Sequence, residues 1–207
     1  MRNLATTLAT FLLAGNAMAF DSGIDLSHLE LSGDCEYDDI TIVEENGETW
    51  IAAYLDSMAA FTEGGIDRKR CTMNYQVDLP YGHKLDFFQF SVDGTYQVAD
   101  TGAARLTVSH RVLNGKSVRT TKFFKGNGHF RDADINDFTG DITYFDLERK
   151  YQRCGAEIPL ETSVHMHVTQ STNDHGYTAL VLDEGVTSGD SNPGYIKFCK
   201  IKILPCL

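Results

Sequence analysis

The chain has 207 residues, of which 29 are Asp or Glu and 18 are Lys or Arg, so its formal net charge is −11. This acidic balance disfavours nucleic acid and anionic membranes as partners, because binding to phosphates needs a basic surface. It is compatible with high solubility, with calcium binding or with a cationic partner.

The first nineteen residues carry the features of a secretory signal peptide. Arg2 supplies a positive charge, an uncharged run from Leu4 to Gly15 follows, and Ala17-Met18-Ala19 forms a small-residue cleavage signal. The uncharged run is too short to span a bilayer, and no second run is long enough. We therefore predict that residues 1–19 are removed, that the protein is secreted and extracellular, and that its cysteines are oxidised.

The next residues predict a hairpin after a polar lead-in. Residues 20–34 form the lead-in, and an Asn-Gly turn then separates Ile40–Val43 from Thr49–Leu55. The stretch from Trp50 to Phe61 also fits a short helix. Apolar and polar side chains alternate over residues 72–79, which predicts a half-buried strand that Pro80 ends.

The remainder of the chain continues this pattern of short strands with turn signals between them. Further strands are expected at Leu85–Val92, Tyr96–Val98, Arg105–Val112, Ser117–Phe124, Ile142–Leu147, Leu160–Thr169, Tyr177–Leu182 and Tyr195–Leu204. About ten short strands at this spacing predict an all-β fold, an antiparallel, jelly-roll-like β-sandwich. No repeat or linker divides the sequence, so we expect one domain over residues 35–207.

Five cysteines remain after the leader, and none has the spacing of a zinc site. Four of them can form two disulfides, which leaves one over. A strand at the C-terminal end of the chain places Cys199, Ile201 and Ile203 on one face, with lysines on the other. We therefore expect Cys199 to be the free cysteine, buried as a small apolar residue.

The order of several motifs resembles domain-of-unknown-function family 4360, small secreted cysteine-containing β proteins of fungi and bacteria. The resemblance covers residues 35–206. The motifs that carry it are Cys35, Arg70-Cys71-Thr72-Met73-Asn74-Tyr75 leading to Leu79-Pro80-Tyr81-Gly82, the segment Gly94 to Gly102, Phe138-Thr139-Gly140 followed by Cys154-Gly155 and Leu160–Val168, and the terminal Lys202–Cys206. The sequence departs from the family in having only Tyr151 before the cysteine-glycine pair, and in the extra Cys199.

This resemblance implies secretion and a disulfide-stabilised all-β domain, and it implies no catalytic residues. Our preferred pairing is Cys35 with Cys71 and Cys154 with Cys206, although four cysteines allow three pairings. The second bridge would close a loop of about fifty residues, which is worth about 4 kcal/mol in the chain-entropy model.

Two segments have features of metal sites. In His165-Met166-His167 the two histidines lie on one strand face and could bind one ion with a third ligand from a neighbouring strand. Asp132–Asn136 begins like a calcium loop, but Asp137 replaces the required glycine and Thr143 the required glutamate. We expect polar-face histidines and an acidic turn instead, and hence no metal ion and no cofactor.

The sequence contains no nucleophile elbow, and Gly189-Asp190-Ser191 has no helix after it. A pair of carboxylates for glycoside hydrolysis cannot be located among so many acidic residues. Exposed aromatic side chains could instead form a platform that stacks on sugars, although most aromatic residues are expected in the core. The candidates for such a platform are Tyr81, Phe87, Tyr96 and Tyr144.

These observations favour a non-enzymatic extracellular binding or surface-interaction domain that acts as a monomer, with a carbohydrate or a protein as its ligand. One alternative is a secreted hydrolase that acts on an extracellular polymer. Another is a structural component of an extracellular matrix or coat, assembled through the edges of its sheets.

Overall fold

The computed structural model describes residues 22–35, 39–45, 47–54, 58–92, 94–130, 141–182 and 196–206. Four features named from the sequence lie outside these residues: the leader at 1–19, the acidic loop Asp132–Asn136, the motif Phe138-Thr139-Gly140 and the segment Gly189-Asp190-Ser191. Within the described residues, no helix is long and apolar enough to cross a membrane.

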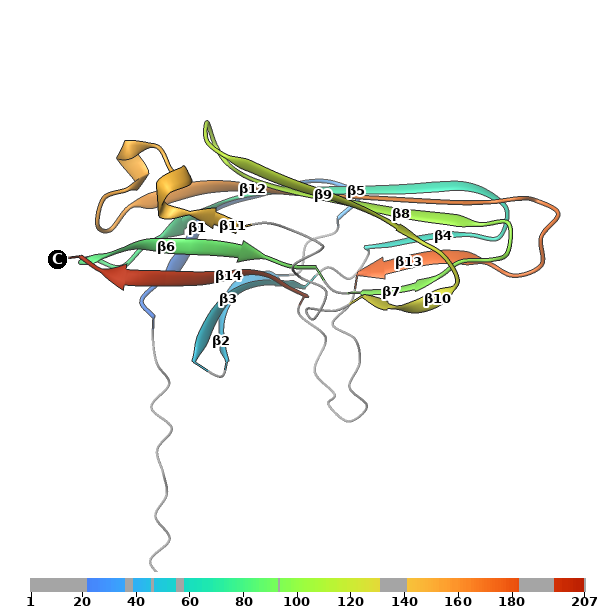
Figure 1. The fold of residues 1–207 in the computed structure, drawn as a ribbon, viewed down its shortest axis with the longest axis horizontal. Coiled ribbons are helices and arrows are strands. Elements are labelled where there is room, and N and C mark those ends of the chain that lie inside the picture. Colours follow the sequence, from blue (N-terminus) through green and yellow to red (C-terminus); the bar gives the residue numbers. More distant parts are fainter. Residues whose placement is uncertain are drawn as a thin grey trace, which may run out of the picture.

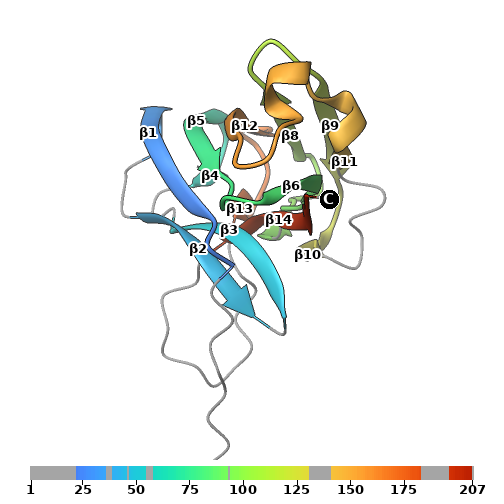
Figure 2. The same cartoon turned by 90° about the vertical axis from the view of Figure 1, so that its left-hand side faces the viewer.

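The protein is an all-β sandwich in which one long sheet faces two shorter ones (Figures 1 and 2). Sheet 1 has the strand order β1 (Asp25–Gly33), β5 (Gly65–Asp78), β12 (Glu157–Gln170), β8 (Ala103–Val112) and β9 (Ser117–Phe124). Sheet 2 has the order β11 (Asp141–Thr143), β6 (His83–Phe90), β14 (Ile196–Pro205), β3 (Glu48–Tyr54) and β2 (Asp39–Glu45). Sheet 3 has the order β10 (Asn127–Phe130), β7 (Gly94–Gln97), β13 (Thr178–Leu182) and β4 (Ala59–Thr62).

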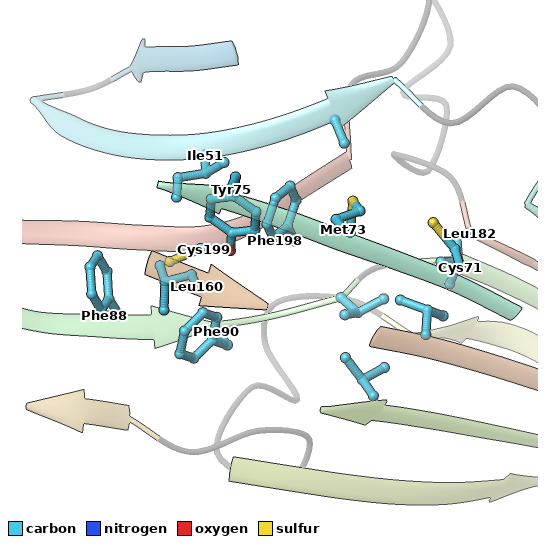
Figure 3. Packing of buried hydrophobic residues seen from close by; sticks show 14 of the residues in the cluster. Ile51, Cys71, Met73, Tyr75, Phe88, Phe90, Leu160, Leu182, Phe198 and Cys199 are labelled. Atoms are coloured by element: carbon cyan, nitrogen blue, oxygen red, sulfur yellow. The ribbon is translucent and has the colours of Figure 1, made fainter. Parts of the chain in front are cut away.

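Sheets 2 and 3 lie end to end under the long strands of sheet 1, and every strand pairing between the described strands is antiparallel (Figure 1). The core lies between the two layers. Strand β12 shows how the sequence builds it, because alternate residues from Ile158 to Val168 are buried against sheets 2 and 3. Phe88 and Phe90 on β6 and Leu160 on β12 point into the same core (Figure 3).

Strand β1 lies in the segment that we expected to be a polar lead-in. It pairs along β5, and Leu26, Leu29 and Leu31 pack against the core. The register shifts between Ser27 and Glu30, so the leucines do not follow a strict period of two. This bulge explains why the sequence pattern did not indicate a strand.

The expected strand Ile142–Leu147 is wrong in its second half. Strand β11 ends at Thr143, and the 3₁₀ turn η2 (Tyr144–Asp146) follows. The carboxylate of Asp146 accepts hydrogen bonds from the backbone N–H of Thr143 at 2.9 Å and from its hydroxyl at 2.8 Å. These bonds close the turn and hold the pKa of Asp146 below its usual value.

The region from Trp50 to Phe61 contains two strands, β3 and β4, and the helical alternative is wrong for the part that the structure describes. Neither β4 nor β10 was expected. Both have only four residues, which is too short for an alternating pattern to stand out.

Two disulfides join the four cysteines that the sequence analysis selected: Cys35 bonds to Cys71, and Cys154 bonds to Cys206. Cys199 is a free cysteine and fully buried. Its neighbour Phe198 is buried as well, because the register of β14 against β3 shifts between Lys197 and Cys199.

Candidate functional site

The outer face of sheet 3 carries an open groove of about 470 Å³. The strand register explains which side chains reach it. Ala179 on β13 stands opposite Gln97 on β7 on one side and Phe61 on β4 on the other, and Gln97 in turn faces Asn127 on β10. Leu180 and Leu182 alternate with the groove residues of β13 and are buried in the core.

Two partly exposed aromatic rings flank one end of this groove. Phe61 is 48% exposed and Tyr177 is 39% exposed. Their ring centroids lie 5.3 Å apart, with a tilt of 38° between the planes. The pair therefore presents apolar surface to solvent beside the groove, and we call it the aromatic pair.

The loop before β13 holds Tyr177 in place through hydrogen bonds at both of its ends. Asp174 accepts hydrogen bonds from the backbone N–H of Thr101 at 2.9 Å and from its hydroxyl at 2.7 Å. These bonds hold the pKa of Asp174 below its usual value. The side-chain amide of Gln170 donates to the carbonyl of Gly176, the residue before Tyr177, at 2.9 Å.

A close contact between Gly128 and the side chain of Tyr96 lies behind the groove, on the core face of sheet 3. A Cβ atom on Gly128 would lie 2.6 Å from the hydroxyl oxygen of Tyr96, so only glycine fits there without moving the tyrosine. The Tyr96 ring packs against Phe124 with centroids 4.7 Å apart. Tyr96 stands opposite the buried Leu180, so its ring lies on the core face of sheet 3 and is not a platform on the groove face.

The part of the groove lining that the structure describes is uncharged. It combines apolar surface with amide and hydroxyl groups that can donate and accept hydrogen bonds. The lining residues are Thr95, Tyr96, Gln97, Asn127, Gly128, Tyr177, Ala179 and Val181.

The four aromatic residues predicted as a sugar platform do not come together. Only Tyr96 lines the groove. Tyr81 is 98% exposed in the turn between β5 and β6, at the end of the sandwich where sheet 2 lies. Phe87 and Tyr144 belong to the β6–β11 side of sheet 2, where the ammonium groups of Lys202 and Lys84 lie 5.6 Å and 5.0 Å from their ring centroids.

His165 and His167 lie on the outer face of sheet 1, as their alternation with Val164, Met166 and Val168 predicted. The neighbouring strand β5 places Arg70 opposite His165 and Arg68 opposite His167. Cations therefore stand where a third metal ligand would be needed. In the part of the chain that the structure describes, no group of three metal-binding side chains occurs.

No protein-family model and no curated protein matches the chain. Two solved structures with some likeness to it are complexes of other proteins with oligosaccharides. TmCBM61 in complex with beta-1,4-galactotriose is 14% identical, with 75% of this chain and 89% of that chain covered and a TM-score of 0.24. The family 11 carbohydrate-binding module from Clostridium thermocellum, in complex with a beta-1,3-1,4-mixed-linked tetrasaccharide, is 10% identical, with 89% of each chain covered and a TM-score of 0.17. Likeness at these scores carries no argument about this chain.

Proposed function

We propose that the protein is an extracellular, non-enzymatic binding domain whose ligand is a neutral glycan held on the outer face of sheet 3. The observation that carries the proposal is the groove itself, which has an aromatic pair at one end and uncharged amide and hydroxyl groups along its length. The two disulfides support the extracellular part, because such bonds persist in oxidising compartments.

The aromatic pair gives the groove its affinity for the apolar face of a sugar ring. Tyr and Phe offer large, rigid surfaces with little rotamer freedom to lose on binding. Gln97 on β7 and Asn127 on β10 lie opposite each other on adjacent strands. Their side-chain amides can form hydrogen bonds with sugar hydroxyls. A mostly apolar groove with a few placed polar groups is typical of small-molecule sites.

The charge of the groove indicates a neutral ligand. The protein carries a net charge of −11, but none of the described residues that line the groove is charged. An anionic ligand would meet the repulsive field of this net charge, and no cation among the described lining residues would compensate it. A neutral sugar has no net charge, so this field does not weaken its binding.

The lining also favours binding over hydrolysis at this site. Glycoside hydrolysis uses two carboxylates on either side of the scissile bond. Among the described residues, no carboxylate lines the groove. The described lining therefore offers groups that can hold a glycan and no carboxylate that could cleave it.

Truncation of the aromatic pair tests the proposal. The double variant Phe61→Ala/Tyr177→Ala is expected to bind at least one neutral polysaccharide about tenfold more weakly than the parent, because it loses the two rings that contact the sugar. The measurement is the retardation of the native protein in gels that contain hydroxyethyl cellulose, xylan, galactomannan or mixed-linkage β-glucan.

The matched control is Tyr81→Ala/Phe145→Ala, which also removes one tyrosine and one phenylalanine side chain. These residues lie elsewhere on the protein, where Tyr81 is 98% and Phe145 is 87% exposed. This variant is expected to migrate like the parent in every gel. Parent migration that is unaffected by all four polysaccharides, or equal loss of binding in both double variants, contradicts the proposal.

A further inference from the structure

The outer face of sheet 1 carries a cluster of cationic side chains that the groove on sheet 3 does not involve. Arg68 and Arg70 extend from β5, His165 and His167 from β12, Arg105 from β8 and Arg119 from β9. We call this set the basic face. Neighbouring strands lie about 4.8 Å apart and alternate residues along one strand about 7 Å apart, so these groups share a compact area.

The pKa values of the two histidines reflect how close the neighbouring cations are. Burial and the guanidinium groups of Arg70, Arg119 and Arg105 lower the pKa of His165. Burial and the guanidinium groups of Arg68 and Arg105 lower the pKa of His167 in the same way. The Nη2 atom of Arg105 lies 3.5 Å from the Nδ1 atom of His167.

The guanidinium groups of the basic face remain available to bind an anionic ligand. Within the described ranges, Arg111 is the arginine of this sheet face whose guanidinium group pairs with a carboxylate, that of Glu161 at 2.7 Å, and it lies at the border of the basic face. The carboxylate of Asp34 lies beside Arg70, where it accepts the backbone N–H of that residue at 2.8 Å. Concentrating unpaired cations costs free energy through mutual repulsion. An anionic ligand would relieve this cost, since guanidinium groups bind carboxylates and similar oxyanions through paired hydrogen bonds.

Hydroxyl groups and one aromatic ring lie among these cations. Thr72 and Ser163 form a hydrogen bond of 3.1 Å between their hydroxyls, and Thr107 and Thr121 form one of 3.0 Å. Phe123 stands opposite Arg105 on the edge strand β9 and is 70% exposed. Thr72, Ser163 and Thr107 are buried, whereas Thr121 and Phe123 are exposed. The basic face therefore offers a polymer its charges together with one exposed hydroxyl and one exposed aromatic ring.

The opposite end of the same sheet face is acidic. Asp25, Asp78 and Glu157 occupy one row across β1, β5 and β12. A planar anionic membrane or a rigid duplex would meet this row and the net negative charge of the protein, and both would be repelled. A flexible polymer chain can lie along the cations alone, because screening limits repulsion to about 10 Å.

We infer that the basic face binds an anionic polysaccharide through the carboxylate or sulfate groups of the polymer. This site is separate from the groove for a neutral glycan, so its failure leaves the proposed function intact. The two sites lie on sheets 1 and 3, which form opposite layers of the sandwich (Figure 1).

Dextran sulfate, polygalacturonate and uncharged dextran are the probes of this inference. The full protein is expected to bind at least one of the two anionic polymers more tightly than dextran, and to release it as NaCl rises from 50 to 300 mM, because counterions are displaced on binding. The variant Arg70→Gln/Arg105→Gln is expected to bind about tenfold more weakly. A preference between the two polymers identifies the anion as sulfate or carboxylate.

The matched control is Arg149→Gln/Arg153→Gln, which makes the same change in net charge at exposed positions outside the basic face. It is expected to bind the polymer like the parent, as is Phe61→Ala/Tyr177→Ala. Equal weakening in both arginine variants would overturn the inference. So would binding to phosphatidylserine vesicles or to duplex DNA that is as tight as binding to the polymers.

Acidic pH is expected to strengthen binding to dextran sulfate severalfold between pH 8 and pH 5.5. His165 and His167 have lowered pKa values in the free protein, and a bound polyanion stabilises their protonated forms. A group whose pKa rises on binding favours the complex at low pH. In His165→Gln/His167→Gln, titration calorimetry should give a flatter pH profile, and an unchanged profile would show that the histidines do not contact the polymer.

Discussion

Replacing Cys154 and Cys206 together by serine is expected to lower the free energy of unfolding by about 4 kcal/mol. The bridge between them spans 52 residues, and its removal frees this loop in the unfolded chain. For a chain of this size, the loss corresponds to a fall in the thermal midpoint of about 8–16 °C. Urea unfolding followed by circular dichroism measures the change.

The position of this bridge explains why its loss should act on the native state as well. Cys206 follows the last strand, β14, and its backbone N–H donates to the carbonyl of Gly82 at 2.7 Å. Gly155, next to Cys154, donates to the carbonyl of His83 at 2.8 Å. The bridge therefore fastens the end of sheet 2 to the loop that leads into β12 of sheet 1 (Figure 1).

Reduction supplies the control for this experiment. With both bridges opened by a reductant, the parent and Cys154→Ser/Cys206→Ser should have equal free energies of unfolding, because exchanging partly exposed sulfur for oxygen changes the packing little. A parent that is no more stable than the variant under oxidising conditions would contradict the chain-entropy account. The other bridge is a poorer probe, since Cys71 is fully buried and its replacement also alters the core.

The strands that the sequence predicts correctly are those whose side chains alternate over many residues. Strand β12 is the clearest case: its buried and exposed positions, including His165 and His167, follow a period of two over most of its length. The burial of Cys199 and Ile201 follows from the same rule in β14. A strand with one buried face alternates apolar and polar residues along its own sequence, so the sequence alone predicts which of its positions are buried.

The candidate groove depends on information that is not local. Phe61 comes from a four-residue strand and Tyr177 from the end of a loop, and they meet only because β4 pairs with β13. Likewise, Arg70 and Arg105 flank β12 only through pairings between strands that are far apart in the chain. The choice of neighbouring strands depends on the packing of the whole sandwich, which periodicity within one strand does not encode.

A buried histidine leads to the second prediction. His110 on β8 is 1% exposed and lies between sheets 1 and 2, stacked on Phe90 with ring centroids 3.9 Å apart. Its Nδ1 atom lies 2.9 Å from the hydroxyl oxygen of Thr162, and its Nε2 atom has no hydrogen-bond partner. The ring is therefore neutral, and burial lowers its pKa from 6.5 to about 3.

This histidine is expected to make the fold sensitive to acid. The unfolded chain takes up a proton at His110 below pH 6.5, whereas the folded protein does not until about pH 3. The stabilising contribution is therefore complete above pH 6.5 and falls as the pH drops towards 3. Between pH 8 and pH 5 the loss from this one residue amounts to about 2 kcal/mol.

Replacing His110 by phenylalanine isolates this contribution, since an aromatic ring can still stack on Phe90 while the titrating group and the unpaired Nε2 atom are removed. Thr162 keeps its hydrogen bond to the hydroxyl of Tyr75 at 3.0 Å, so no buried group is newly orphaned. Relative to the parent, His110→Phe should gain about 2 kcal/mol in unfolding free energy on going from pH 8 to pH 5. All other titratable groups are common to both proteins, so their contributions cancel in the difference between the two free energies of unfolding. Urea unfolding at each pH measures this difference. If it does not change with pH, His110 is not buried as a neutral ring.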